Sequence, residues 1–205
     1  MKRNIISVVI LFSLIIGSLG LVGCGKAEEP SDGSSGDHSV YDATWVDSSI
    51  VPEEEGASKG LENFSTLDLY GNPVDKGIFA SYKVTVVDVW GTYCNPCISA
   101  MTTLAKIYKE YEPQGVNVIG LVSDVQSADY VPKKDYIMKA MEITDKTGAS
   151  FTHILFSQNI VSGVGKDIIA IPASFIVDSE GKLITEISYG SHTEEQWREI
   201  LNAYI

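Results

Sequence analysis

Two cysteines three residues apart, Cys94 and Cys97, are the side chains in this sequence best suited to chemistry. A run of β-branched and aromatic residues from Val84 to Trp90 precedes them, and apolar residues with helical spacing follow. At the start of a helix, unpaired N–H groups and the positive end of the dipole favour a thiolate, which is the reactive form of cysteine. The spacing therefore predicts a thiol pair that opens and closes a small disulfide, which is redox chemistry.

The same spacing also occurs in half of a zinc site and in structural disulfides. A closed zinc site needs two further ligands, and the remaining candidates are Cys24 and three scattered histidines, His38, His153 and His192. A disulfide between residues three apart closes too small a loop to stabilise a fold by much. A redox-active disulfide is therefore favoured over a zinc site and over a structural disulfide. The sequence predicts no metal site and no cofactor.

The cysteine pair lies in the segment Trp90-Gly91-Thr92-Tyr93-Cys94-Asn95-Pro96-Cys97, and a later segment reads Ala170-Ile171-Pro172-Ala173-Ser174-Phe175-Ile176-Val177-Asp178. The first resembles the W-A/G-x-W-C-x-x-C signature of TlpA/ResA-like membrane-anchored thiol–disulfide oxidoreductases, and the second resembles their I/V-P-T-T-F-x-x-D segment. The resemblance covers roughly residues 61–205. It implies an α/β domain of thioredoxin-like fold, with a central mixed β-sheet flanked by helices on both faces and a redox disulfide between Cys94 and Cys97.

Position along the expected helix separates the roles of the two cysteines. Cys94 lies closer to the helix start, so we expect it to be the attacking thiolate, and Cys97, one turn in, to resolve the mixed disulfide. The resemblance implies a cis peptide bond before Pro172, although a trans proline at a strand start is the alternative. The exposed backbone of Ile171 could then pair with an extended client strand. The expected client-binding residues are Trp90, Tyr93, Asn95, Pro96, Ile171 and Pro172.

Asp88 lies six residues before Cys94, in the middle of an apolar strand. The resemblance places it on the buried aspartate of thioredoxin, which helps to move protons to and from the resolving thiol. A desolvated carboxylate has a raised pKa and can take the proton of Cys97. A purely structural aspartate is the alternative. The glutamate that ResA-like members carry three residues after the second cysteine is replaced here by Ala100, so its role cannot be transferred.

The first 23 residues have the layout of a signal peptide, with Lys2 and Arg3 followed by an apolar stretch. The end of this stretch, Leu21-Val22-Gly23-Cys24, resembles the lipobox of bacterial lipoproteins, which implies cleavage before Cys24 and lipidation of its thiol. A retained membrane anchor is the alternative. Both place the domain on the extracytoplasmic face of the bacterial cell membrane.

Residues 24–60 are expected to form a flexible acidic tether. Within them, residues 28–37 are acidic, rich in Gly and Ser and nearly free of apolar side chains. Exceptions that could pack on the domain are Tyr41, Trp45, Ile50 and Val51, although a solvated spacer is favoured. The formal net charge of −12 disfavours nucleic acid as a partner, because binding to phosphates relies on Lys and Arg.

Residues 61–205 suit one domain, expected to be a monomer. The patterns predict an N-terminal hairpin over 64–74, parallel strands over 84–90 and 116–122 joined by a helix over 95–111, and a helix over 135–147. They further predict a strand over 153–156, an antiparallel hairpin of strands over 168–177 and 182–189, and a last helix capped by Thr193. The expected core face of that helix is Trp197, Ile200, Leu201 and Tyr204.

These features favour an enzyme that reduces disulfides in client proteins, such as the haem-site cysteines of apocytochrome c or an extracytoplasmic reductase. Electrons would come from a membrane thiol-electron carrier of the CcdA/DsbD kind. Two alternatives stay open: an oxidant that introduces disulfides, and a thioredoxin-fold binding module whose cysteine pair takes no part in binding.

Overall fold

The structure is a computed structural model that describes residues 41–47 and 58–205. The predicted signal peptide, Cys24 and most of the predicted tether lie outside the described residues, so lipidation stays a prediction. Within the ranges described, no helix has both the length and the apolar character needed to cross a bilayer.

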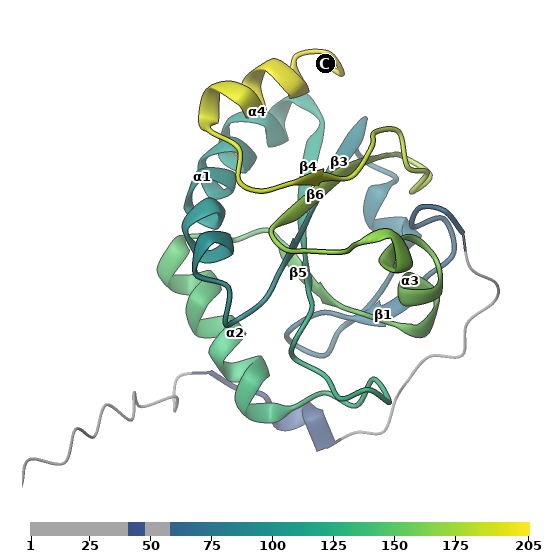
Figure 1. Cartoon of the computed structure of the whole chain (residues 1–205), viewed down its shortest axis with the longest axis vertical. Coiled ribbons are helices and arrows are strands. Elements are labelled where there is room, and N and C mark those ends of the chain that lie inside the picture. The colour runs from purple at the N-terminus through teal and green to yellow at the C-terminus, as the bar shows by residue number, and fades with distance from the viewer. Residues whose placement is uncertain (1–40, 48–57) are drawn as a thin grey trace, which may run out of the picture. The chain divides into compact units, whose positions relative to one another are not determined.

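A five-stranded sheet forms the centre of the domain, in the order β5-β4-β3-β6-β7 (Figure 1). The strands are β3 (Val84–Trp90), β4 (Val116–Val122), β5 (Thr152–Leu155), β6 (Ala173–Asp178) and β7 (Ser188–Tyr189). β3 pairs with β4 and β4 with β5 in parallel, whereas β6 is antiparallel to both β3 and β7. The mixed sheet expected from the sequence is therefore present.

Helices cover both faces of this sheet, unequally. α1 (Asn95–Tyr111), α2 (Lys134–Thr147) and α4 (Glu194–Leu201) pack on one face, on the left and at the top of Figure 1. The other face is covered by the short α3 (Gln158–Ser162) and a 3-10 turn at Lys76–Phe79, beside the hairpin of β1 (Ser65–Leu67) and β2 (Pro73–Asp75). The sequence predicted the hairpin and the three longer helices but not α3.

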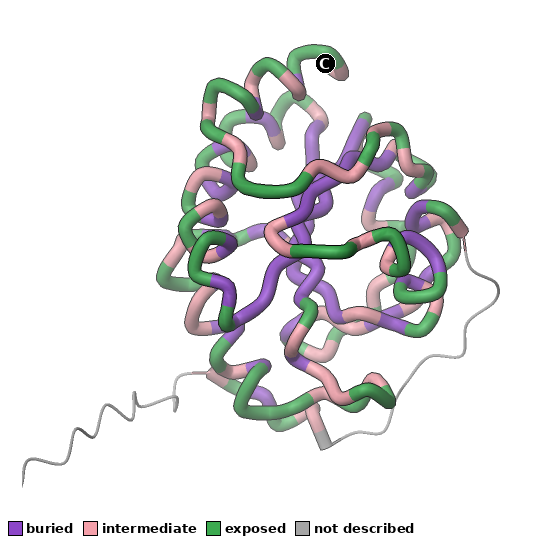
Figure 2. The backbone as a smooth tube through the Cα atoms, in the orientation of Figure 1, coloured by how far each residue is buried: buried purple, intermediate pink, exposed green. Residues whose placement is uncertain are grey.

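The central strand β3 is buried along its whole length, as the continuous apolar run predicted (Figure 2). Successive side chains point to opposite faces of a sheet. Val86 and Trp90 belong to the core under α1, and Val87 and Val89 belong to the core on the other side. Asp88 must therefore face α1, which is the helix that carries Cys97.

Helix ends follow the capping rules used to predict them. The Thr193 hydroxyl accepts a hydrogen bond from the Gln196 N–H, and Oε1 of Gln196 accepts one from the Thr193 N–H, which makes a capping box at the start of α4. Gly148 ends α2 in the left-handed conformation, at φ 70°. Tyr204, expected on the core face of the last helix, lies beyond its end and is partly buried.

The predicted strands over 168–177 and 182–189 were wrong in extent. The first begins only at Ala173, after the cis bond at Pro172, and residues 168–172 form a loop. The returning chain makes an isolated bridge at Leu183 and regular pairing only in β7. One cause is that the hydroxyl of Thr185 accepts the Ile176 N–H at 2.9 Å, in the place of a strand carbonyl.

Part of the predicted tether, residues 41–47, contacts the domain. Ala43 is 2% exposed, and the indole N–H of Trp45 donates to the Leu69 carbonyl at 3.2 Å. Gly71, at φ 81°, lies against the same indole, since a Cβ there would meet its ring carbon at 2.5 Å. Residues around Trp45 therefore pack on the domain, because burial of Ala43 and partial burial of the indole offset the entropy cost of ordering a few residues.

Candidate active site

The thiol pair is closed into a disulfide at the point where β3 gives way to α1. Cys94 and Cys97 are bonded, with their Cα atoms 5.3 Å apart. Cys94 retains 7% of its surface and Cys97 none, whereas Asn95 and Pro96 between them are exposed. A partner sulfur can therefore approach Cys94 but not Cys97.

Cys94 is also the N-cap residue of α1. Its sulfur accepts a hydrogen bond from the Cys97 N–H at 3.3 Å, and its carbonyl accepts one from the Ile98 N–H at 3.1 Å. Pro96 occupies the first turn, where its missing N–H removes no helical bond. When the disulfide opens, the same amide and the helix dipole favour a thiolate at Cys94.

Asp88 lies in the sheet beneath this helix. It is 4% exposed, and its Oδ2 has no hydrogen-bond partner. On either side of it, the paired residues are Gly120 of β4 and Ser174 of β6. Burial raises the pKa of Asp88 to about 7, because a desolvated carboxylate loses the hydration that stabilises its charge. A group with this pKa can exchange a proton near neutral pH.

The loop before β6 forms the other side of the site. The Ile171–Pro172 peptide bond is cis, as the resemblance implied, and the Pro172 carbonyl accepts the Gly190 N–H at 2.8 Å. A Cβ added to Gly91 would lie 3.3 Å from Cδ1 of Ile171. The loop of the cis proline and the loop that carries Cys94 are therefore in contact.

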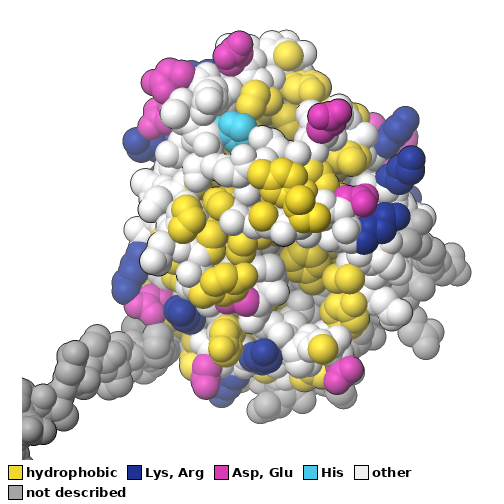
Figure 3. Space-filling view, in the orientation of Figure 1, with side chains coloured by type: hydrophobic (Ala, Val, Ile, Leu, Met, Phe, Trp, Pro, Cys, Tyr) yellow, Lys and Arg dark blue, Asp and Glu magenta, His cyan; other side chains and the backbone are white. Residues whose placement is uncertain are grey.

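Exposed apolar side chains accompany these two loops. Tyr93 is 67% exposed, Ile169 83% and Tyr189 43%. Figure 3 shows apolar side chains gathered over β7 and the loop that leads into β6. The Tyr189 hydroxyl donates to the Asp167 carbonyl at 2.8 Å and accepts the Ile169 N–H at 3.4 Å, so this loop is held in place although its side chains are open to solvent.

Trp90 does not fit the predicted client contact. Its side chain is completely buried, and its indole N–H donates to Nδ1 of His153 at 3.2 Å. Because Nδ1 accepts, the proton of the imidazole lies on Nε2, 3.3 Å from the Ala149 carbonyl. Burial lowers the pKa of His153 to about 4, so the ring is neutral and both of its nitrogens are used.

Sequence reasoning missed His153 as a partner of the tryptophan. Space for its ring comes from Gly120, where a Cβ would lie 2.1 Å from Nδ1 of His153 and 2.9 Å from Nε1 of Trp90. A glycine inside a buried strand is a sign of such a close approach, and it was the available signal. The contact explains how the tryptophan before the thiol pair is fixed from β5.

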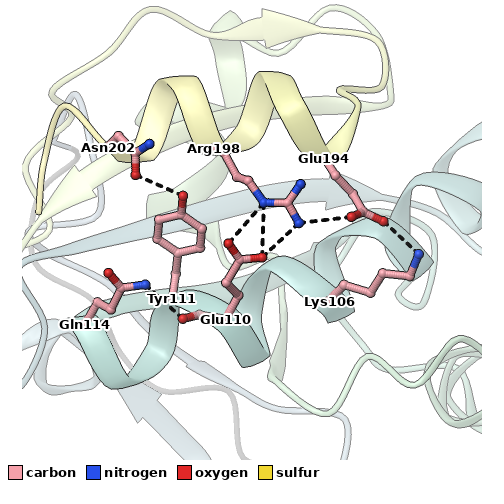
Figure 4. A network of polar contacts seen from close by, with 7 residues as sticks. All are labelled: Lys106, Glu110, Tyr111, Gln114, Glu194, Arg198 and Asn202. Atoms are coloured by element: carbon pink, nitrogen blue, oxygen red, sulfur yellow. Dashed lines mark hydrogen bonds and ion pairs between the residues drawn. The ribbon is translucent and has the colours of Figure 1, made fainter.

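A polar network connects α4 to α1, the helix that carries Cys97 (Figure 4). Arg198 of α4 binds Glu110 of α1 with both Nε and Nη2, at 3.0 and 2.9 Å, and Glu194 accepts from Lys106 at 2.7 Å. Beside them, on the left of Figure 4, the Tyr111 hydroxyl donates to Oδ1 of Asn202 at 3.0 Å. The side chains of the ion pairs are between 28% and 63% exposed, so each contact contributes modestly, and together they orient α4 along α1.

Among residues 41–47 and 58–205, no group of three or more His, Cys, Asp or Glu side chains is arranged to hold a metal ion. The two cysteines are bonded to each other, and His153 is occupied by Trp90 and Ala149.

Comparison with known proteins agrees with this geometry. The family model of Redoxin matches residues 55–203. Thiol-disulfide oxidoreductase ResA of Bacillus thuringiensis subsp. konkukian is 32% identical over 152 residues, which is 73% of this chain and 79% of that protein. ResA of Bacillus subtilis is 24% identical over 172 residues, covering 80% and 83% of the two chains.

Solved structures support the fold alone. A thiol:disulfide interchange protein of the thioredoxin family from Chlorobium tepidum superposes with a TM-score of 0.57 at 16% identity, over 76% of this chain and 99% of that one. The thioredoxin domain of a thiol-disulfide oxidoreductase from Bacteroides vulgatus gives 0.53 at 19% identity, over 74% and 100%. The fold is therefore thioredoxin-like, and the chain belongs to the Redoxin family as a thiol–disulfide oxidoreductase homologous to ResA.

Proposed function

We propose that this protein reduces disulfides of client proteins on the outer side of the cytoplasmic membrane. The observation that carries the proposal is the placement of the pair: a slightly exposed Cys94 capping α1, a fully buried Cys97 behind it, and the cis proline loop alongside. The homology to ResA, which is named as a thiol-disulfide oxidoreductase, supports exchange chemistry at this pair.

Reduction proceeds in two exchange steps that start from the open thiol pair. The Cys94 thiolate attacks one sulfur of the client disulfide, forming a mixed disulfide and releasing the other client sulfur as a thiolate that takes up a proton. The Cys97 thiolate then attacks Cys94, which closes the disulfide seen here and releases the second client thiolate. The client gains two electrons and the protein loses them.

Asp88 serves as the base for the second step. Cys97 is completely buried, and burial in apolar surroundings disfavours the thiolate that must attack Cys94. Asp88 faces the same helix from β3, and its pKa of about 7 suits it to accept a proton near neutral pH. Ala100 stands where ResA-like members carry a glutamate, so Asp88 takes that part here.

The client binds as an extended segment along the cis proline. The backbone of Ile171 is free to pair with it, as peptides do at exposed strand edges. Tyr93, Asn95 and Pro96 are exposed next to Cys94, and Ile171 and Pro172 are partly exposed. Trp90 supports this surface from below.

Attachment to the membrane follows from the N-terminal sequence. Cleavage before Cys24 and diacylation of its thiol would hold the domain, as a monomer, at the extracytoplasmic face, with the residues before Tyr41 as tether. A membrane thiol-electron carrier of the CcdA/DsbD kind would reopen the Cys94–Cys97 disulfide after each turnover. Apocytochrome c or an extracytoplasmic reductase would be the client.

The reduction potential of the pair tests the direction of exchange. Equilibration of the full chain with glutathione or dithiothreitol buffers, followed by thiol alkylation and mass spectrometry, measures it. We expect a value near that of thioredoxin, about −270 mV, because a reductant must give electrons to its clients. A value near that of DsbA, about −120 mV, would instead identify an oxidant that introduces disulfides.

A further inference from the structure

The loop that carries Cys94 is held by a carboxylate from the neighbouring strand. Asp124 follows β4 and accepts three hydrogen bonds from Thr92: the backbone N–H reaches Oδ1 and Oδ2 at 3.0 Å each, and the hydroxyl reaches Oδ2 at 2.6 Å. Thr92 is 3% exposed and Asp124 is partly buried. The bonds form between residues 32 positions apart in the sequence, so they fix tertiary structure.

Two further contacts make this loop compact. The Trp90 carbonyl accepts the Ser123 N–H at 2.9 Å, and the Cys94 N–H donates to the Gly91 carbonyl at 3.0 Å, closing a turn over residues 91–94. The carboxylate of Asp124 therefore holds Thr92, which lies two residues before Cys94 inside this turn. Partly buried charges on neighbouring residues of one loop interact measurably, because solvent and salt screen them little over distances below a Debye length of about 10 Å.

We propose that Asp124 is a positioning residue that holds the active-site loop through Thr92 and, by its charge, limits how readily Cys94 ionises. The amide of Cys97 and the dipole of α1 favour the thiolate at Cys94, and a fixed negative charge across the turn opposes it. The Thr92 N–H and hydroxyl partly neutralise that charge. Asp88, buried in the sheet below α1, contributes a second carboxyl group on the side of the sheet that carries the pair.

The test uses the full chain with Cys97→Ala, in which Cys94 can be alkylated without closing a disulfide. The alkylation rate of Cys94 by iodoacetamide at pH 7 is followed on its own peptide by mass spectrometry, so that Cys24 does not interfere. Asp124→Asn keeps the size and an accepting oxygen but removes the charge. Thr92→Val keeps the charge of Asp124 but removes the hydroxyl that donates to it. Thr92→Ser keeps both the charge and a hydroxyl donor.

We expect Asp124→Asn to raise the alkylation rate of Cys94 by about twofold to fourfold, since loss of an opposing charge changes the thiolate equilibrium by about half to one pKa unit and a less basic thiolate is a weaker nucleophile. Thr92→Val should lower the rate by a similar factor, because the carboxylate loses a neutralising hydroxyl. Thr92→Ser should match the parent. Glu199→Gln, which removes a charge from the exposed face of α4, should also match it.

The reduction potential of the pair, measured with Cys97 restored, is the second readout. Loosening of the loop alone would shift this potential in the same direction in both variants. We expect it to rise in Asp124→Asn and to fall in Thr92→Val, since a more stable thiolate stabilises the reduced state. Rates and potentials of both variants equal to those of the parent, or shifted in the same direction, would overturn the proposal. The inference rests on Cys94 as the nucleophile but holds for a reductant and for an oxidant.

Discussion

Replacement of Cys94 by serine is expected to abolish turnover of a model disulfide peptide, whereas replacement of Cys97 by alanine should leave one round of attack. The reason is geometric: Cys94 alone reaches the surface, and Cys97 is completely buried behind it. A serine hydroxyl does not ionise near neutral pH and cannot form a disulfide. We expect the loss of turnover to exceed about a thousandfold in both variants, because the two thiols act as one unit.

Stopped-flow mixing of the reduced variants, each also carrying Cys24→Ser so that no other thiol reacts, with an excess of the peptide separates the two steps. Cys97→Ala should release one client thiol per protein and then stop, while Cys94→Ser should release none. Cys94→Ala provides a matched control for the size of the side chain. Release of a full equivalent by Cys94→Ser would contradict the assignment of the nucleophile.

Replacement of Asp88 by asparagine is expected to slow the resolution of the mixed disulfide by about 10²–10⁴-fold at neutral pH. Attack by Cys94 should change much less, because its thiolate is favoured by the helix start. In the parent, the resolution rate should rise with pH through about 7 as the Asp88 carboxyl ionises. The variant should lack this rise. Pre-steady-state measurements across a pH series give both quantities, and equal resolution rates in parent and variant would reduce Asp88 to a structural residue.

The same substitution should also change how stability depends on pH. The folded pKa of Asp88 is raised to about 7, so its protonated form stabilises the fold. This contribution is fully present below the unfolded pKa of about 3.9 and is lost as pH rises through about 7, a loss of at most about 4 kcal/mol. Asp88→Asn should therefore be more stable relative to the parent at pH 8 than at pH 5 in urea unfolding.

The sequence could predict what local pattern determines. A seven-residue apolar run meant a strand buried on both faces, and Cys-x-x-Cys at its end placed the thiol pair at a helix start. Resemblance supplied the cis bond at Pro172, which local preference alone could not, since most prolines are trans.

What escaped prediction depends on contacts between segments distant in the sequence. Trp90 was expected to meet the client, but His153, across β4 on β5, takes its indole N–H. The hydrogen bonds from Thr92 to Asp124 likewise join the ends of two strands, and no periodic pattern in the sequence indicates this contact. The strand at 182–189 was overestimated because apolar alternation cannot show that Thr185 replaces a backbone acceptor. Such side-chain hydrogen bonds are set by tertiary structure.

Covalent trapping in cells tests most directly whether the pair exchanges disulfides with clients. The full chain carrying Cys97→Ala is expressed, cells are quenched with acid and an alkylating agent, and complexes are resolved with and without reducing agent. We predict reducible complexes joined through Cys94 to extracytoplasmic proteins, and none in the variant that lacks both Cys94 and Cys97. Absence of such complexes from Cys97→Ala, with the same proteins still bound noncovalently by the variant lacking both cysteines, would contradict redox function and identify a binding module.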